Sequence, residues 1–270
     1  MSHPLFWIGL LGVLQGLTEF LPVSSSGHLA LGQLVFGLEE GGLALNVTLH
    51  AGTLLATFLV LRRRVAEAIL DGARAVVRPS RFLSTPGGRD ALFVILASLP
   101  TAVLGLLLRD LVEHWTHSPL AVGLGFVTTT FLLVSTWWAA DGSDETPSWG
   151  MSLLIGLVQG LAVMPGLSRS GTTICVALWL GIRRERAFEL SMLASLPAVA
   201  GAVLLELPDL ADNPIGVGPA VLGAGIAFAV GIVALVLLRK AVVRGHFPLF
   251  ALWTLPLAVA TLAMAHAWPR

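Results

Sequence analysis

The chain has 270 residues, of which 56% are hydrophobic and 12% are charged, and its formal net charge at pH 7 is zero. Soluble domains carry about 25% charged residues, so this composition excludes an ordinary soluble protein and indicates an integral membrane protein. The balanced charge gives no sign of a nucleic-acid-binding surface, and the single cysteine, Cys175, excludes an internal disulfide.

The first predicted element is a re-entrant helical hairpin over residues 5–38. The stretch is too short for two membrane helices of about 20 residues each plus a turn, and residues 22–27 (PVSSSG) interrupt it in the middle. Irregular backbone at membrane depth is tolerated only where protein or a water-filled cavity covers it. The residues before the hairpin lack the basic segment of a signal peptide, so we expect it to belong to the mature protein.

Several apolar stretches further along the chain approach the ~20 residues that a membrane-spanning helix needs. Among them, residues 149–182 have the same build as 5–38 and predict a second re-entrant hairpin. We therefore expect an all-α integral membrane protein with about six spanning helices and two hairpins. The predicted spans are 43–61, 91–108, 119–138, 187–205, 217–238 and 248–268.

The basic residues predict the orientation of these helices. If loop 62–90 is cytoplasmic, the spans place 183–186 and 239–246 on the same side. These three loops hold most of the 16 Lys and Arg residues, as the positive-inside rule expects. The acidic loop 139–147 is cytoplasmic in the same topology, although it carries carboxylates. Both chain ends then lie outside.

In this orientation the two hairpins enter from opposite sides, which makes the chain an inverted repeat. We expect a single membrane domain over 1–270, with one repeat at 1–138 and the other at 149–270. The segments QGLTEFLPVSSSGH (15–28) and QGLAVMPGLSRSGT (159–172) share their Gln-Gly-Leu and Ser-x-Ser-Gly letters. A duplicated break inside hydrophobic segments points to a site built where the repeats meet.

The residue types at the two breaks favour an anion such as phosphate. Each returning helix begins near a glycine, Gly27 or Gly171, and helix N-termini present free N–H groups and partial positive charge. Arg169 supplies a planar fork that matches phosphate oxygens. The candidate hydroxyl donors are Ser24, Ser25, Ser26, Ser168, Ser170, Thr172 and Thr173.

An acid and an imidazole lie beside these donors. Glu19 follows Gln15 by four residues on one helical face, and His28 opens the returning helix. Together with Arg169 they suggest hydrolysis by phosphoryl transfer. Structural roles stay open: small residues allow close helix packing, Arg169 and Glu19 could form a buried ion pair, and His28 could be a buried histidine without a catalytic role. His50 could line the site or only pack.

The two motifs, at 15–28 and 165–173, resemble the signature motifs of bacterial undecaprenyl-pyrophosphate phosphatases of the bacitracin-resistance type, and residues 49–53 (LHAGT) are similar to a further family segment. The resemblance implies a membrane enzyme of interdigitated inverted repeats. It would hydrolyse undecaprenyl diphosphate to undecaprenyl phosphate and inorganic phosphate, which recycles the lipid carrier of peptidoglycan synthesis. It also implies the bacterial cell membrane, a site open to the extracytoplasmic side, and a divalent cation, Mg²⁺ or Ca²⁺.

The resemblance links Glu19, Ser25, His28, Ser168, Arg169 and Thr173 to activity. We expect Arg169 to hold the diphosphate, Ser25 to attack it or to orient water, and His28 to act as general base and acid, with Glu19 as the catalytic carboxylate and candidate metal ligand. Gln15 and Asn46 stand where some relatives have acidic residues, which leaves one carboxylate here. The predicted diphosphate-binding residues are Gln15, Ser24, Ser26, Gly27, Ser168, Ser170, Gly171, Thr172 and Thr173.

An alternative function is a secondary transporter or flippase for a phosphorylated lipid. Inverted repeats, broken helices and an anion site at the membrane midplane are also transporter features. The combination of Glu19 and His28 with the candidate nucleophile Ser25 favours the enzyme, because transport alone does not require it. A purely structural scaffold explains neither Arg169 nor Glu19 at membrane depth.

Overall fold

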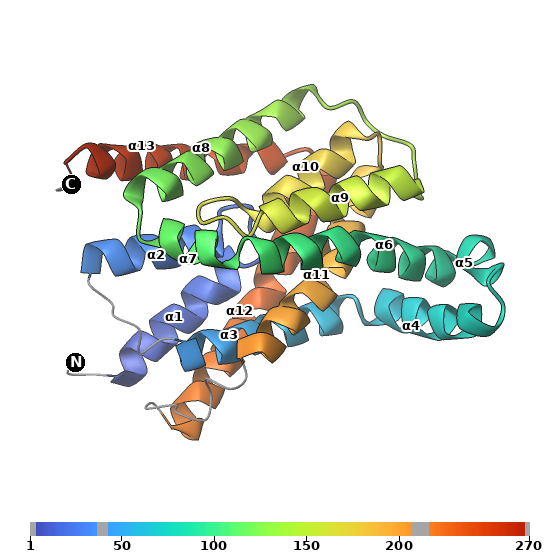
Figure 1. Ribbon diagram of the computed structural model, residues 1–270, viewed down its shortest axis with the longest axis horizontal. Helices are drawn as coiled ribbons and strands as arrows, with labels where there is room; N and C mark the ends of the chain where they lie inside the picture. Colours follow the sequence, from blue (N-terminus) through green and yellow to red (C-terminus); the bar gives the residue numbers. More distant parts are fainter. Residues whose placement is uncertain (1–3, 37–42, 207–215, 268–270) are drawn as a thin grey trace.

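The computed structural model describes residues 4–36, 43–206 and 216–267, and within these ranges the chain is α-helical and contains no strand (Figure 1). This confirms the predicted all-α class. The helices are α1 (Pro4–Thr18), α2 (Ser25–Phe36), α3 (Leu43–Val60), α4 (Arg62–Val77), α5 (Arg81–Ser84), α6 (Pro86–Leu107), α7 (Arg109–Thr116), α8 (Pro119–Ser135), α9 (Trp149–Leu161), α10 (Arg169–Trp179), α11 (Arg184–Glu206), α12 (Val217–Val243) and α13 (Ala251–Ala267), with 3-10 turns η1 (Thr136–Trp138) and η3 (Phe247–Phe250).

Five helices in the described ranges are long and apolar enough to cross a membrane: α6, α8 with η1, α11, α12, and η3 with α13. They coincide with five of the predicted spans. The remaining predicted span, 43–61, coincides with α3, a helix of 18 residues. Polar residues such as His50, Thr53 and Thr57 occur along it.

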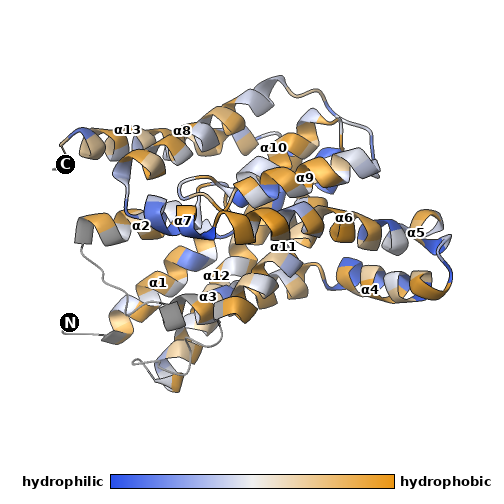
Figure 2. Cartoon of the chain, in the orientation of Figure 1, coloured by the Kyte–Doolittle hydropathy of each residue, from blue (hydrophilic) through white to orange (hydrophobic). Residues whose placement is uncertain are grey.

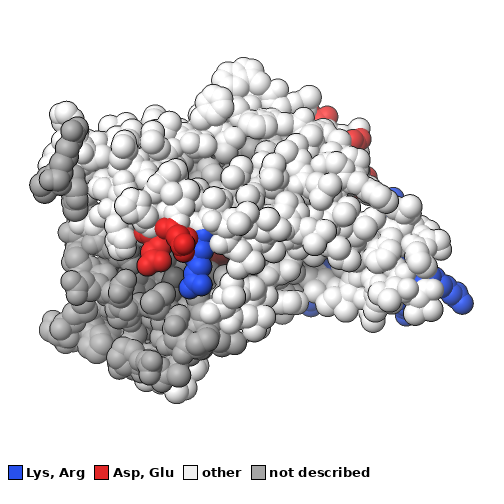
Figure 3. All heavy atoms as spheres, viewed as in Figure 1, with Lys and Arg blue, Asp and Glu red and all other residues white. Residues whose placement is uncertain are grey.

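The outer surface of the helices is apolar. Large hydrophobic side chains such as Leu106, Phe131 and Val221 are more than half exposed. Hydrophobic residues predominate along the helices (Figure 2), and the charged side chains on the face shown in Figure 3 gather in a few groups with uncharged surface between them. Soluble monomers rarely expose apolar patches of this extent. The exposed surface is therefore suited to lipid, and the chain is a multi-pass membrane protein.

Helices from the two halves of the chain are intermixed. Helices α1 and α3 of the first half pack on α12 of the second half. Helix α9 of the second half packs on α6 of the first half, and α11 of the second half packs on both α3 and α6. In Figure 1 the α1–α2 hairpin opens toward the left of the view and the α9–α10 hairpin opens toward the right. An inverted repeat requires this arrangement, and its boundaries at 1–138 and 149–270 stay a prediction.

Each predicted hairpin is a helix, an irregular break and a returning helix. The breaks lie at 19–24 and 162–168, between α1 and α2 and between α9 and α10. They pack against each other: a Cβ at Gly27 would lie 2.8 Å from Gly166 Cα, and one at Gly171 would lie 3.4 Å from Pro22 Cβ. These approaches place the starts of α2 and α10 side by side.

The region 62–90, which we expected to be a loop, is mostly helical. Helix α4 buries Val65, Ala68 and Ala75 and packs on α6, while its arginines lie on the other faces. The apolar residues recur at helical spacing, but the basic residues between them obscure the pattern in a search for long apolar stretches. The correction adds a short helical arm, α4 and α5, at the right of Figure 1.

The structure explains the acidic loop 139–147. Asp141 accepts a hydrogen bond from Arg184 Nε at 2.7 Å, and Glu145 pairs with Arg183 Nε at 2.9 Å. The loop therefore lies beside the basic segment 183–186, as the predicted topology requires. Its carboxylates neutralise arginines of the same membrane side, so they do not contradict the positive-inside pattern.

The close contact of α3 with α12 yields a stability prediction. A Cβ at Gly52 would clash with the backbone carbonyl of Ala224, and overpacking of this kind costs about 1–3 kcal/mol. We expect Gly52→Ala to lower the thermal unfolding midpoint of the detergent-solubilised protein. Gly225→Ala is the matched control, because that glycine of α12 faces open space, and alanine there favours the helix. Equal midpoints for the two variants would contradict the prediction.

Candidate active site

The two breaks end in the same hydrogen-bond pattern. Ser24 Oγ accepts from the backbone N–H of Gly27 at 3.1 Å, and Ser168 Oγ accepts from that of Gly171 at 3.1 Å. Ser24 Oγ also lies 3.3 Å from Ser26 Oγ, and Ser168 Oγ lies 3.3 Å from Ser170 Oγ. These are N-caps of α2 and α10. The caps take the N–H groups of Gly27 and Gly171. The backbone N–H groups before them in each first turn have no intrahelical partner, which is the arrangement that binds anions at helix N-termini.

The backbone at these caps is held in place by neighbours. Ser24 has φ 68°, a left-handed conformation that a serine adopts only where its surroundings enforce it. In the second break, the N–H of Ser168 donates to Thr129 Oγ1 at 2.9 Å, and the Thr129 hydroxyl donates to Gly166 O at 2.8 Å. Helix α8, which carries Thr129, therefore anchors the second cap.

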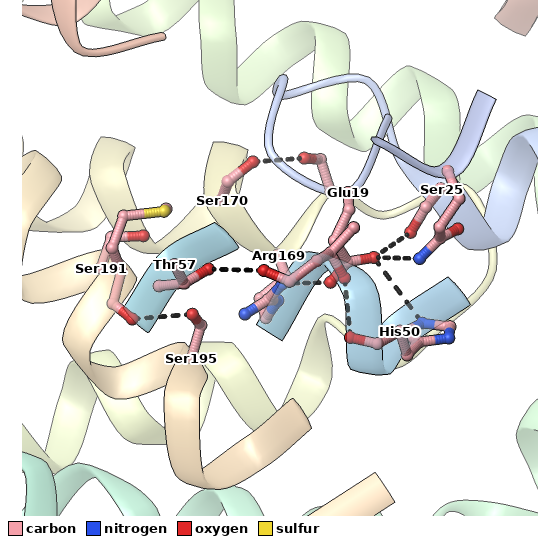
Figure 4. A network of polar contacts seen from close by, with 12 residues as sticks. Glu19, Ser25, His50, Thr57, Arg169, Ser170, Ser191 and Ser195 are labelled. Atoms are coloured by element: carbon pink, nitrogen blue, oxygen red, sulfur yellow. Dashed lines mark hydrogen bonds and ion pairs between the residues drawn. The ribbon is translucent and has the colours of Figure 1, made fainter. Parts of the chain in front are cut away.

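Glu19 is the centre of the polar cluster (Figure 4). The residue is 8% exposed, and Arg169 donates to its Oε1. Its Oε2 accepts from Gln15 Nε2 at 3.0 Å and from Ser25 Oγ at 3.0 Å. The carboxylate thus joins the two hairpins, because Arg169 belongs to the α9–α10 hairpin and the other partners belong to the α1–α2 hairpin. A buried carboxylate in a membrane protein needs such partners.

Arg169 retains an unused donor. One of its terminal nitrogens, Nη2, contacts Glu19, and the other, Nη1, is buried without a hydrogen-bond partner among the described residues. Buried N–H groups of a guanidinium are costly to leave unpaired. Arg169 is the first residue of α10, and an unpaired guanidinium N–H is suited to a phosphate oxygen.

Ser25 is the hydroxyl best placed to react. It lies at the first position of α2, it is partly exposed, and it donates its proton to Glu19 Oε2. A nucleophilic hydroxyl requires an acceptor within hydrogen-bond reach to take its proton. The structure therefore brings together three of the predicted catalytic residues: Glu19, Ser25 and Arg169.

The fourth predicted catalytic residue, His28, faces elsewhere. Its Nδ1 lies 2.8 Å from Ser24 O, and Trp253 Nε1 of α13 donates to its Nε2 at 3.0 Å. An indole N–H can only donate, so Nε2 is the acceptor and Nδ1 carries the proton that bonds Ser24. Neither nitrogen contacts Glu19 or Ser25 among the described residues, and the acid–base role of His28 stays a prediction.

The histidine beside the carboxylate is His50 of α3. Its Nε2 lies 3.7 Å from Glu19 Oε2, on the side of the cluster opposite Arg169 in Figure 4. The sequence left this residue open between site wall and packing, and the structure puts it in the wall. Trp253 was not anticipated at all, because nothing in its sequence surroundings connects α13 with residue 28.

The other predicted binding residues mainly build the site. Thr172 Oγ1 donates to Ser168 O and Thr173 Oγ1 donates to Arg169 O, each at 2.8 Å. Thr173 also lies 2.6 Å from Ser191 Oγ, which ties α10 to α11. Gln15, 1% exposed, orients Glu19. Gly27 and Gly171 permit the close approach of the two breaks described above.

The cluster does not form a protein cage for a metal ion. In the described ranges, no group of three or more His, Cys, Asp or Glu side chains is arranged to hold one. Glu19 is the only carboxylate of the cluster, and both of its oxygens already accept hydrogen bonds. A divalent cation would therefore need ligands from the substrate in addition to Glu19.

A test of His28 follows from its two hydrogen bonds. The side-chain N–H of asparagine occupies nearly the position of histidine Nδ1, so we expect His28→Asn to keep turnover within about tenfold by holding Ser24. We expect His28→Gln, which lacks that donor position, to lose more. Equal losses of about 10²-fold or more in both variants would instead support proton transfer by His28. Phosphate release at saturating substrate is the measurement.

The fold and the site define a polytopic all-α membrane protein with a polar cluster between two broken helices. A family model described as "Bacitracin resistance protein BacA" matches residues 8–260. Similar proteins named undecaprenyl-diphosphatase occur in Desulforapulum autotrophicum (42% identical over 252 residues, 90% of this chain and 91% of the relative) and in Desulfosudis oleivorans (41% over 261 residues, 94% and 96%). One from Korarchaeum cryptofilum is 37% identical over 258 residues, 94% of this chain and 97% of the relative. The chain belongs to the BacA family.

Proposed function

We propose that this protein is an undecaprenyl-diphosphatase, which hydrolyses undecaprenyl diphosphate to undecaprenyl phosphate and inorganic phosphate. The relatives that share most of its length carry that name. The observation that supports the activity here is the hydrogen bond that the Ser25 hydroxyl donates to the carboxylate of Glu19. The unpaired Nη1 of Arg169, the first residue of α10, adds a donor for phosphate to the same cluster. Binding alone would not require an acceptor for the serine proton.

The geometry suggests the course of the reaction. Arg169 and the N-termini of α2 and α10 bind the terminal phosphate and stabilise the charge of the transition state. Ser25 Oγ forms a bond to that phosphorus as its proton passes to Glu19, and the P–O bond to the lipid monophosphate breaks. Water then cleaves the phosphoserine, releases inorganic phosphate, and the proton returns from Glu19 to Ser25 Oγ.

We propose that a divalent cation, Mg²⁺ or Ca²⁺, accompanies the diphosphate. Mg²⁺ is usually bound by one or two carboxylates together with substrate phosphates, which matches the single carboxylate Glu19. The cation would neutralise phosphate charge. We also propose the bacterial cell membrane as the location, with the site open to the extracytoplasmic side. The basic residues of α4 and of the segment before α11 support this orientation.

The direct test is phosphate release from undecaprenyl diphosphate by the purified protein in detergent, where no gradient can drive transport. We expect release in the presence of Mg²⁺ or Ca²⁺ and its loss with a chelator. Failure of a well-folded protein to release phosphate with either cation would favour the transporter or flippase, with the same residues binding a lipid phosphate.

The choice between serine and water as nucleophile has its own test. We expect Ser25→Ala to lose about 10²-fold or more in turnover, and a rapid acid quench of the wild-type reaction to trap phosphate on Ser25. Ser98→Ala is the matched control, because the Ser98 hydroxyl only bonds the backbone of its own helix, at Val94 O. A fully active Ser25→Ala protein would show that this serine is not the nucleophile.

A further inference from the structure

A cavity lined by arginines lies away from the candidate active site. It has a volume of about 420 Å³ and lies where α3 and α12 end and α11 begins. We call it the arginine cavity. Its basic lining residues are Arg62, Arg63, Arg64 and Arg239.

Two of these arginines have no counter-charge. Arg64 donates to Glu189 Oε2 at 3.1 Å, and Arg239 pairs with Glu185. Within the described part of the chain, Arg62 and Arg63 form no ion pair, and both side chains are exposed. Two unpaired guanidinium groups at one cavity give it a net positive charge.

The only carboxylate that lines the cavity is already occupied. Glu189 Oε2 accepts from Arg186 Nη1 at 3.1 Å as well as from Arg64. Arg186 in turn pairs with Asp90, which is fully buried. Among the described residues, this network engages Glu189 and Asp90 with Arg64 and Arg186, and it includes neither Arg62 nor Arg63. The positive charge of the cavity is therefore available to a ligand.

The opposite wall is apolar. Val60, Phe188 and Ile232 line the cavity, and Leu59, beside them, is 42% exposed. A ligand that matches both walls carries a phosphate and a hydrocarbon chain. Planar guanidinium groups bind phosphate oxygens in pairs, and basic pockets between membrane helices accept lipid head groups.

We propose that the arginine cavity binds the head-group phosphate of an anionic membrane phospholipid, with an acyl chain along the apolar wall. The cavity is separate from the site around Glu19, because the helical rise along α3 from His50 to the lining residue Val60 is about 15 Å. The proposal therefore does not depend on the phosphatase reaction.

The test is titration of the detergent-solubilised full chain with phosphatidylglycerol, with bound lipid counted by native mass spectrometry. We expect Arg62→Gln/Arg63→Gln to weaken binding about 30-fold, from the usual contribution of two basic residues near a lipid phosphate. The matched control is Arg74→Gln/Arg78→Gln, which removes the same charge from two exposed positions outside the cavity, one in the last turn of α4 and one just after it. This variant should bind like the wild type. Both double variants should keep their thermal unfolding midpoints in detergent.

Competing results identify other sources of the signal. Equal weakening in the Arg74→Gln/Arg78→Gln control would show diffuse charge attraction and overturn the proposal. Loss of phosphatidylglycerol in Arg169→Ala, with the cavity arginines intact, would place the lipid in the candidate active site. Displacement of the lipid by inorganic phosphate at similar concentration would indicate a site for free anions and overturn the proposal. Binding of phosphatidylcholine as tight as that of phosphatidylglycerol would show that the net charge of the lipid does not matter, which would also overturn it.

Discussion

Arg169→Ala is expected to lower kcat/KM for undecaprenyl diphosphate by about 10³-fold or more. Arg169 is the only arginine of the polar cluster around Glu19, and one of its nitrogens is buried without a partner. Guanidinium groups that stabilise transferring phosphoryl groups contribute factors of about 10³–10⁵. Arg169→Lys should recover part of the loss, since lysine restores the charge without the planar fork.

The control for this change is Arg184→Ala. Arg184 is also an arginine in an ion pair, with Asp141, but it lies at the start of α11 in the basic segment 183–186. We expect its loss to leave turnover unchanged within a few-fold. Near-normal phosphate release by a folded Arg169→Ala protein would remove Arg169 from the reaction and leave it a structural partner of Glu19.

The positions of the two breaks could be predicted from sequence because their cause is local. Gly, Pro and Ser interrupt an apolar helix wherever they cluster, so 22–27 and 165–171 define the ends of α1, α2, α9 and α10 within a few residues. Each of the two interrupted segments is too short for two full membrane spans, which predicted a re-entrant hairpin in each. The convergence of the breaks followed from their duplication, and the contact of Gly27 with Gly166 shows it directly.

The partners of the polar side chains could not be predicted in the same way. Whether Glu19 meets His28 or His50 depends on how α3 crosses α1 and on which way the first turn of α2 points. The indole of Trp253 comes from α13, more than 200 residues away in sequence. Such pairings are decided by helix packing and not by local spacing. Sequence reasoning therefore identified the cluster and misjudged which imidazole lies nearest to its carboxylate.

Glu19→Gln is the second change with a large expected effect. Glutamine cannot take the proton of Ser25, and loss of a positioned base costs about 10²–10⁴-fold in rate. It also leaves the Arg169 charge without its partner in a mostly buried site. Removing one member of a buried pair destabilises a protein by about 3–5 kcal/mol, so the thermal unfolding midpoint should fall as well.

The double variant Glu19→Gln/Arg169→Gln separates the two effects. With both charges removed, no unpaired ion remains, and neutral replacements of a buried pair are often tolerated. We expect its unfolding midpoint to rise above that of Glu19→Gln alone, while phosphate release stays abolished. The recovery of stability without activity would show that Glu19 and Arg169 are coupled in the fold and also needed for the reaction. A double variant no more stable than Glu19→Gln would mean that the ion pair contributes little, and the carboxylate would then act mainly through Ser25.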